Sequence, residues 1–176
     1  MSILTASKFR YGRHGYLEAY IPLTGSWNCI TDALPMGEVT ENDRPKIMFR
    51  EFISRDMLIA EPNVLFVFSD DLERAGIGGQ AIEMRGEPNA VGIPTRKSPK
   101  DHSSALFSDA DFQQWRAASL VNWRRLFAHV KNGGSIVWPS NGLGSGTSKL
   151  KEAAPEVDAS IKRNLQAIIE IAEKSN

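Results

Sequence analysis

Short apolar runs and longer polar segments follow one another in a regular order from residue 64 onward. "VLFVF" (64–68) is a continuous apolar run between polar residues, which predicts a strand buried on both faces. "NAVGIPT" (89–95) predicts a second strand and "SIVWP" (135–139) a third. Each predicted strand is followed by a polar loop, and two of these loops are rich in glycine.

The segments between these strands have the apolar period of helices. "GGQAIEMR" (78–85) predicts a short helix that ends near Gly86. Residues 108–134 predict a long helix, which Ser108 or Asp109 caps and a pair of glycines ends. Its apolar stripe consists of Phe112, Trp115, Ser119, Trp123, Leu126 and Val130. With a terminal helix from about residue 158, this order predicts an α/β fold with a mostly parallel sheet.

Residues 1–60 follow a different pattern. "GYLEAYIPLTGSW" (15–27) is typical of a strand interrupted by Pro22 and Gly25, and residues 32–45 are polar and rich in turn formers. "KIMFREFI" (46–53) predicts a strand and residues 54–61 a short helix. We therefore predict one domain of 176 residues, with an irregular N-terminal extension (1–60) and an α/β core (61–176).

Composition narrows the classes of function. The chain has 21 basic and 21 acidic side chains, so any anion site must be local. Cys29 is the single cysteine, which excludes an internal disulfide and predicts a buried thiol. The three histidines are scattered, so we expect neither a metal site nor a cofactor. No apolar run approaches the roughly 20 residues of a membrane span, and a cytoplasmic protein without a membrane partner is expected.

Two glycine-rich segments directly follow predicted strands: "DDLERAGIGGQA" (70–81) and "SNGLGSGTSKL" (140–150). In parallel sheets, ligands bind beyond the carboxyl ends of the strands. Bare backbone N–H groups at such positions accommodate phosphate, and two facing loops can hold a diphosphate. The alternative is that both segments are tight turns. Neither segment has the spacing of a P-loop or of a dinucleotide-binding fingerprint, which disfavours an ATPase or a nicotinamide-dependent dehydrogenase.

The residues that we predict to bind the ligand lie in these two segments and at the end of the strand between them. They are Asp70, Gly76, Gly78, Gly79, Gln80, Thr95, Arg96, Asn141, Gly142, Leu143, Gly144, Ser145, Gly146 and Thr147. Asp70 and Asp71 form a carboxylate pair that can act in acid–base chemistry or bind ribose hydroxyls. Helix capping and loop hydrogen bonds are the structural alternative for both carboxylates.

The order of these motifs resembles the macrodomain. "VFSDDLERAGIGGQA", "VGIPTRKSP", a long helix and "SIVWPSNGLGSGTSKL" are most similar to the branch of DNA ADP-ribosylation-reversing antitoxins and glutamate-ADP-ribose hydrolases. The resemblance covers residues 64–176. It implies a three-layer fold and an ADP-ribose pocket, in which the first loop surrounds the distal ribose and the second holds the diphosphate.

The sequence departs from that branch at the positions that carry its chemistry. Arg96 stands where the branch has a nucleophilic lysine, and a guanidinium stays protonated and cannot attack. Lys97 is adjacent, although strand alternation turns it to the other face. Asp71 matches an asparagine of the branch, and Lys149 lies near the position of its acid. Asp71 and Lys97 are the candidate catalytic residues.

Three functions remain open at this point. The first is binding of an ADP-ribose-type or related phosphorylated nucleotide. The second is an ADP-ribosyl glycohydrolase that removes ADP-ribose from a modified protein or DNA. The third is a protein-interaction or inhibitor module whose interface is formed by the N-terminal extension.

Overall fold

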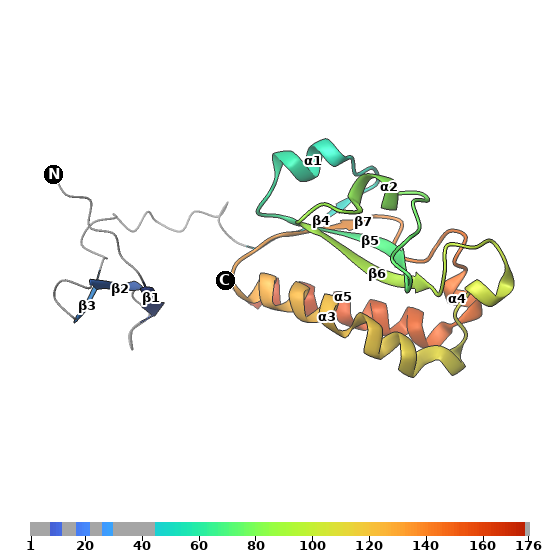
Figure 1. The fold of residues 1–176 in the computed structure, drawn as a ribbon. Coiled ribbons are helices and arrows are strands. Elements are labelled where there is room, and N and C mark those ends of the chain that lie inside the picture. The colour runs from blue at the N-terminus through green and yellow to red at the C-terminus, as the bar shows by residue number, and fades with distance from the viewer. Residues whose placement is uncertain (1–7, 12–16, 22–25, 30–44, 175–176) are drawn as a thin grey trace. The chain divides into compact units, whose positions relative to one another are not determined.

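The computed structural model describes residues 8–11, 17–21, 26–29 and 45–174 (Figure 1). The chain divides into two compact units, Met1–Asn42 and Asp43–Asn176. In the first unit, β1 (Lys8–Tyr11), β2 (Leu17–Ile21) and β3 (Ser26–Cys29) pair antiparallel in the order β1-β2-β3. The predictions for Pro22 and Gly25, and for the thiol of Cys29, lie outside the described residues and side chains.

The second unit is built on a four-stranded parallel sheet in the order β4-β7-β5-β6. Its strands are β4 (Ile47–Arg50), β5 (Leu65–Asp71), β6 (Ala90–Arg96) and β7 (Ile136–Pro139). All four residues of β7 and six of the seven in β5 are buried, as continuous apolar runs require of central strands. The predicted α/β fold with a mostly parallel sheet is confirmed.

Helices cover both faces of this sheet and make three layers (Figure 1). The short helices α1 (Arg55–Ala60) and α2 (Ala81–Met84) lie on one face. The long helices α3 (Phe112–Lys131) and α5 (Pro155–Lys174) lie on the other. Side chains of β5 alternate between the two cores, because Phe66 and Phe68 pack on the side of α1 and α2 whereas Leu65 and Val67 pack on the side of α3 and α5.

Element boundaries differ from the predicted ones at three places. Residues 47–60, which the sequence assigns to the extension, contribute β4 and α1 to the second unit. The long helix begins with a 3₁₀ turn, η4 (Asp109–Asp111), closed by a capping box between Ser108 and Asp111. Helix α5 begins at Pro155 and not at residue 158, because proline suits the first helical position, where no N–H is needed.

Two side chains of helix α3 donate hydrogen bonds to backbone carbonyls of β6, the strand that ends at the candidate site. Trp115 donates its indole N–H to the carbonyl of Pro94 at 2.9 Å, and Asn122 donates its amide to the carbonyl of Gly92 at 2.6 Å. Asn122 is buried although it was not part of the predicted stripe, while Phe112 of that stripe is only half-buried. These bonds fix the position of the strand end.

The remaining connections are short. A 3₁₀ turn, η3 (Ser103–Ala105), lies between β6 and η4, and α4 (Leu150–Ala153) lies between β7 and α5. Among the described helices, none combines the length and the apolar composition that crossing a bilayer requires.

Candidate functional site

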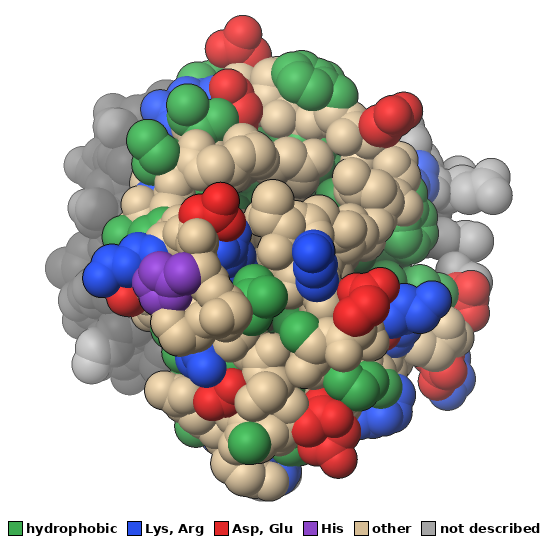
Figure 2. Space-filling view, turned by 90° about the vertical axis from the view of Figure 1, so that its right-hand side faces the viewer, with side chains coloured by type: hydrophobic (Ala, Val, Ile, Leu, Met, Phe, Trp, Pro, Cys, Tyr) green, Lys and Arg blue, Asp and Glu red, His purple; other side chains and the backbone are tan. Residues whose placement is uncertain are grey.

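A cleft of about 770 Å³ lies at the carboxyl ends of β5 and β6. It lies between loop 1 (residues 72–80, after β5) and loop 2 (residues 140–149, after β7). Figure 2 views the second unit from the end where these loops lie, and much of that surface is tan, the colour of backbone and uncharged polar side chains. Parallel strands present their carboxyl ends at one edge of the sheet, so segments about 70 residues apart meet here.

The cleft brings together most of the residues that the sequence predicts for ligand binding. Its lining includes Asp70, Asp71, Gly76, Gly78, Gly79, Gln80, Thr95, Arg96, Asn141, Gly142, Gly144, Ser145, Gly146 and Thr147. Leu143 and Lys97 are not part of this lining. The side chain of Leu143 is buried in the core between the sheet and α3 and α5. Leu143 therefore anchors loop 2 to the core and does not face the cleft.

Loop 2 is tied to the ends of β5 and β6 by hydroxyl groups. Ser69 accepts a hydrogen bond from the backbone N–H of Gly144 at 3.1 Å. The hydroxyl groups of Thr95 and Ser148 form a hydrogen bond with each other, also at 3.1 Å. Gly144 has a φ of +71° and lies against Leu150, so a side chain there would be strained and crowded. The fold itself thus requires glycine at residue 144.

Several backbone N–H groups of the two loops remain available to a ligand. Six N–H groups make no hydrogen bond within the described part of the chain, those of Gly78, Gly79, Ser145, Gly146, Thr147 and Ser148. Gly78 and Gly146 also have ordinary φ values, and a methyl group built on either would meet no protein atom within 4 Å. The fold therefore does not require glycine at these two positions, and the space beside their amides is open.

The carboxylate pair at the end of β5 is held by an arginine that the sequence analysis did not identify. Arg85, which directly follows α2, forms an ion pair with Asp70 and lies 3.6 Å from Asp71. Its Nε donates to the carbonyl of Gly76 at 2.7 Å. Two adjacent acids at the end of a buried strand need a cation nearby, but the sequence alone does not show which of the following basic residues supplies it.

Asp71 shapes loop 1. Its carboxylate accepts hydrogen bonds from the backbone N–H groups of Ala75 at 3.2 Å and Gly76 at 2.8 Å. Both oxygens are thus engaged by the loop, and Arg85 adds a third contact. This geometry favours the structural alternative for Asp71, since its carboxylate is oriented toward the loop amides.

Arg96 joins loop 2 to the segment after β6. Its Nη1 donates to the hydroxyl of Thr147 at 3.1 Å, and its Nη2 donates to the carbonyl of Lys100 at 2.7 Å. The Nε–H group is buried and has no acceptor among the described residues. Arg96 lines the cleft, so its guanidinium places a positive charge beside any anionic ligand that binds there.

Lys97 does not line the cleft. Its side chain forms an ion pair with Asp111, just before α3, with an Nζ–O distance of 3.1 Å. A hydrogen bond from the backbone N–H of Ser108 holds the pKa of Asp111 below its ordinary value of 3.8, and Lys97 acts in the same direction against the opposing effect of burial. The amine of Lys97 therefore serves the start of a helix in this structure.

We expect Asp111→Asn to lower the free energy of unfolding at pH 7 by about 0.3–1 kcal/mol, the usual worth of a carboxylate at a helix start. Because the pKa of Asp111 is lower in the folded state, its contribution is complete above pH 4 to 5 and disappears as the pH falls through the folded-state pKa, below 3.8. Urea unfolding from pH 7 to pH 2.5 measures this. If the difference in the free energy of unfolding between Asp111→Asn and the unmodified protein stays constant down to pH 2.5, the pKa of Asp111 is not responsible for it.

Two exposed apolar side chains line the cleft and were missed by the sequence analysis. Phe52, just after β4, is 70% exposed, and Ile82 of α2 is 55% exposed. Small-molecule sites combine such apolar side chains with a few polar groups. Phe52 could not be assigned from the sequence, because its place in the cleft depends on β4 pairing with β7.

The histidines do not contribute to the cleft in the described part of the chain. His129 lies 3.0 Å from the carbonyl of Ser135, and His102 is bonded to Ser104. His14 falls outside the described residues. No group of three or more His, Cys, Asp or Glu residues suited to a metal ion occurs among the described residues.

Comparison with known proteins gives one match. A family model described as a family of unknown function (DUF7831) matches residues 48–164, which include both loops, α3 and most of the sheet. No curated protein matches the chain. No solved structure matches it either.

Proposed function

Because this chain belongs to a family of unknown function (DUF7831), we propose its function from the geometry of its own cleft. The protein binds an ADP-ribose-type or related phosphorylated nucleotide between loop 1 and loop 2. Its diphosphate lies against the open amides of Ser145–Ser148 and near the guanidinium of Arg96. Amides at the ends of buried strands bind phosphate without needing a basic surface, in accord with a chain of zero net charge.

One observation carries the proposal: glycine occurs at residues 78 and 146 although the protein would accept a side chain at both. The φ angles are ordinary and the space for a methyl group is empty. Glycine lowers stability by about 0.4–1 kcal/mol compared with alanine at such positions. A ligand that must approach the backbone closely accounts for this choice.

The remaining parts of the cleft suit the rest of a nucleotide. Its volume of about 770 Å³ lies within the range of small-molecule sites, roughly 300–1,000 Å³. Phe52 and Ile82 provide apolar surface for a base. The two carboxylates of β5, which would repel a phosphate, are compensated by Arg85. This arrangement supports the macrodomain-like relationship that the sequence motifs imply, and we include that relationship in the proposal.

Isothermal titration calorimetry of the full chain against ADP-ribose, ADP, NAD and a cyclic nucleotide tests the proposal. We expect a dissociation constant of about 1–100 μM for ADP-ribose or one of these relatives, or tighter. The absence of measurable heat for all four compounds would overturn the proposal.

The cleft favours binding over hydrolysis. Arg96 stands where the branch that the motifs resemble has its nucleophilic lysine. Lys97 is paired with Asp111, and Asp71 is engaged by loop amides. We therefore expect the protein to leave an ADP-ribosylated protein or DNA intact. Chromatographic detection of free ADP-ribose after incubation with a modified substrate would support the glycohydrolase alternative instead, with Asp71 as its candidate base.

We expect Phe52→Ala to weaken ADP-ribose binding about tenfold, because stacking of a base on an aromatic ring contributes about 1–3 kcal/mol. The free energy of unfolding should change by less than about 0.5 kcal/mol, since the side chain is largely exposed. Phe49→Ala is the matched control. Phe49 is 52% exposed and does not line this cleft, so equal losses in both variants would argue against a base on Phe52.

A further inference from the structure

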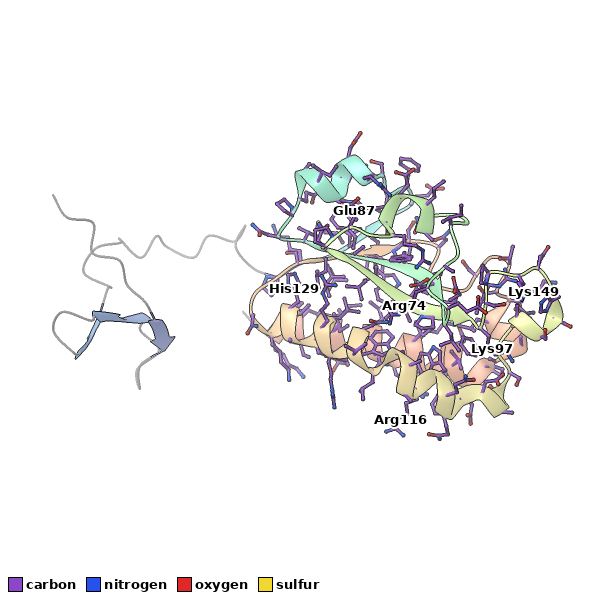
Figure 3. The ribbon with its side chains drawn as sticks, in the orientation of Figure 1. Arg74, Glu87, Lys97, Arg116, His129 and Lys149 are labelled. Carbon is purple, nitrogen blue, oxygen red and sulfur yellow. The ribbon has the colours of Figure 1, made fainter. Side chains whose placement is uncertain are left out.

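A second hollow, which we call the basic groove, lies between α3 and α5. It has a volume of about 620 Å³ and shares no residue with the cleft. Trp115 and Trp123 are among its lining residues, together with the basic side chains Arg116, Arg124 and Lys131 of α3 and Arg163 of α5. Figure 3 shows Arg116 projecting from the helical layer on the side away from the sheet.

Charge in the basic groove is of one sign. The 20 residues of α3 include no Asp or Glu, and no acidic residue lines the groove. Its four cations are exposed, and none of them forms an ion pair with a described carboxylate. By contrast, Arg125 of the same helix donates to the carbonyls of Pro88 and Ala90. In a chain with 21 charges of each sign, this is a local concentration of positive charge that attracts an anion.

The groove also offers apolar surface. Leu120, on its edge, is 45% exposed. Phe112 and Phe127 of α3 also line it and are half-buried. The surface is therefore suited to an occupant that is both acidic and apolar.

We propose that the basic groove binds an acidic, leucine-containing segment of a partner protein. Its carboxylates lie against the four cations and an apolar side chain enters between α3 and α5. Single-stranded nucleic acid fits less well, because Trp115 and Trp123 are 1% and 6% exposed and present no free ring face for base stacking. An anionic membrane also fits less well, because membrane-surface helices present a raised apolar face and not a hollow.

Fluorescence anisotropy of a labelled twelve-residue peptide, (Asp-Glu-Leu)₄, with the full chain tests this proposal. We expect saturable binding that weakens at least tenfold in Arg116→Glu/Arg124→Glu and weakens as salt rises from 50 to 300 mM. The matched control is Lys151→Glu/Lys174→Glu, which changes the charge equally at exposed residues outside the groove and should keep full affinity. The leucine-free peptide (Asp-Glu-Ser)₄ should bind at least fivefold more weakly than (Asp-Glu-Leu)₄.

Three results would overturn the proposal. The first is no binding of (Asp-Glu-Leu)₄ by the unmodified protein. The second is an equal loss of affinity in the groove variant and the control variant. The third is tighter binding of phosphatidylserine vesicles or of a twelve-residue oligothymidine, lost in the same groove variant. If charge reversal prevents folding, Arg116→Gln/Arg124→Gln gives the same comparison with a smaller expected loss, about threefold.

Discussion

Replacing Arg85 with methionine lowers the free energy of unfolding by about 3–5 kcal/mol, the usual cost of removing one partner from a buried ion pair. Asp70 and Asp71 have side chains that are 3% and 5% exposed, and Arg85 is the cation that contacts both. Without it, two adjacent carboxylates remain in a poorly solvated site. The carbonyl of Gly76 also loses its donor, so loop 1 loses one of its attachments. Urea unfolding at pH 7 measures the loss.

Two comparisons separate this effect from a general effect of removing an arginine. Arg116→Met, on the exposed side of α3, should change the free energy of unfolding by less than about 0.5 kcal/mol. In a protein that already carries Asp70→Asn and Asp71→Asn, Arg85→Met should cost at least 1 kcal/mol less than it does alone, because no carboxylate remains to be compensated. Equal costs in the two backgrounds would show that Arg85 acts through packing against Phe68 and not through the carboxylates.

The layers of the second unit could be predicted because they follow from local pattern. The apolar runs of β5 and β7 can only be buried on both faces, and such strands need helices on each side. The position of both glycine-rich loops follows in turn, since parallel strands end at one edge.

The features that could not be predicted depend on contacts between distant segments. Phe52 reaches the cleft only because β4 adds to the sheet beside β7, a strand about 90 residues later in the chain. Arg85 acquires its role from the bend that brings the end of α2 back to β5. Asn122 is polar and interrupts an apolar stripe, yet it is buried because it caps the carbonyl of Gly92. Leu143 is the opposite case. The sequence analysis placed it in the ligand site, but its side chain is buried in the core.

The second large effect concerns the nucleotide and rests on the proposed function. We expect Gly78→Ala/Gly146→Ala to weaken ADP-ribose binding about 100-fold, which corresponds to about 2.7 kcal/mol. Each methyl group would occupy space beside an open amide and keep a phosphate or ribose oxygen at a distance. The same variant should be more stable than the unmodified protein, by about 0.4–1 kcal/mol per substitution, because alanine restricts the unfolded chain. Calorimetry and urea unfolding of one preparation measure both quantities.

Gly144→Ala provides the contrast within loop 2. Its φ of +71° and the Cβ of Leu150, 2.8 Å from an added methyl group, predict a loss of stability of about 1–3 kcal/mol. Glycines that serve the fold and glycines that serve a ligand therefore differ in the sign of their effect on unfolding. If Gly78→Ala/Gly146→Ala retains ADP-ribose affinity within threefold, the nucleotide does not approach these amides. Its diphosphate would then have to bind elsewhere in the cleft, where the guanidinium of Arg96 and the open amides of Thr147 and Ser148 remain as donors.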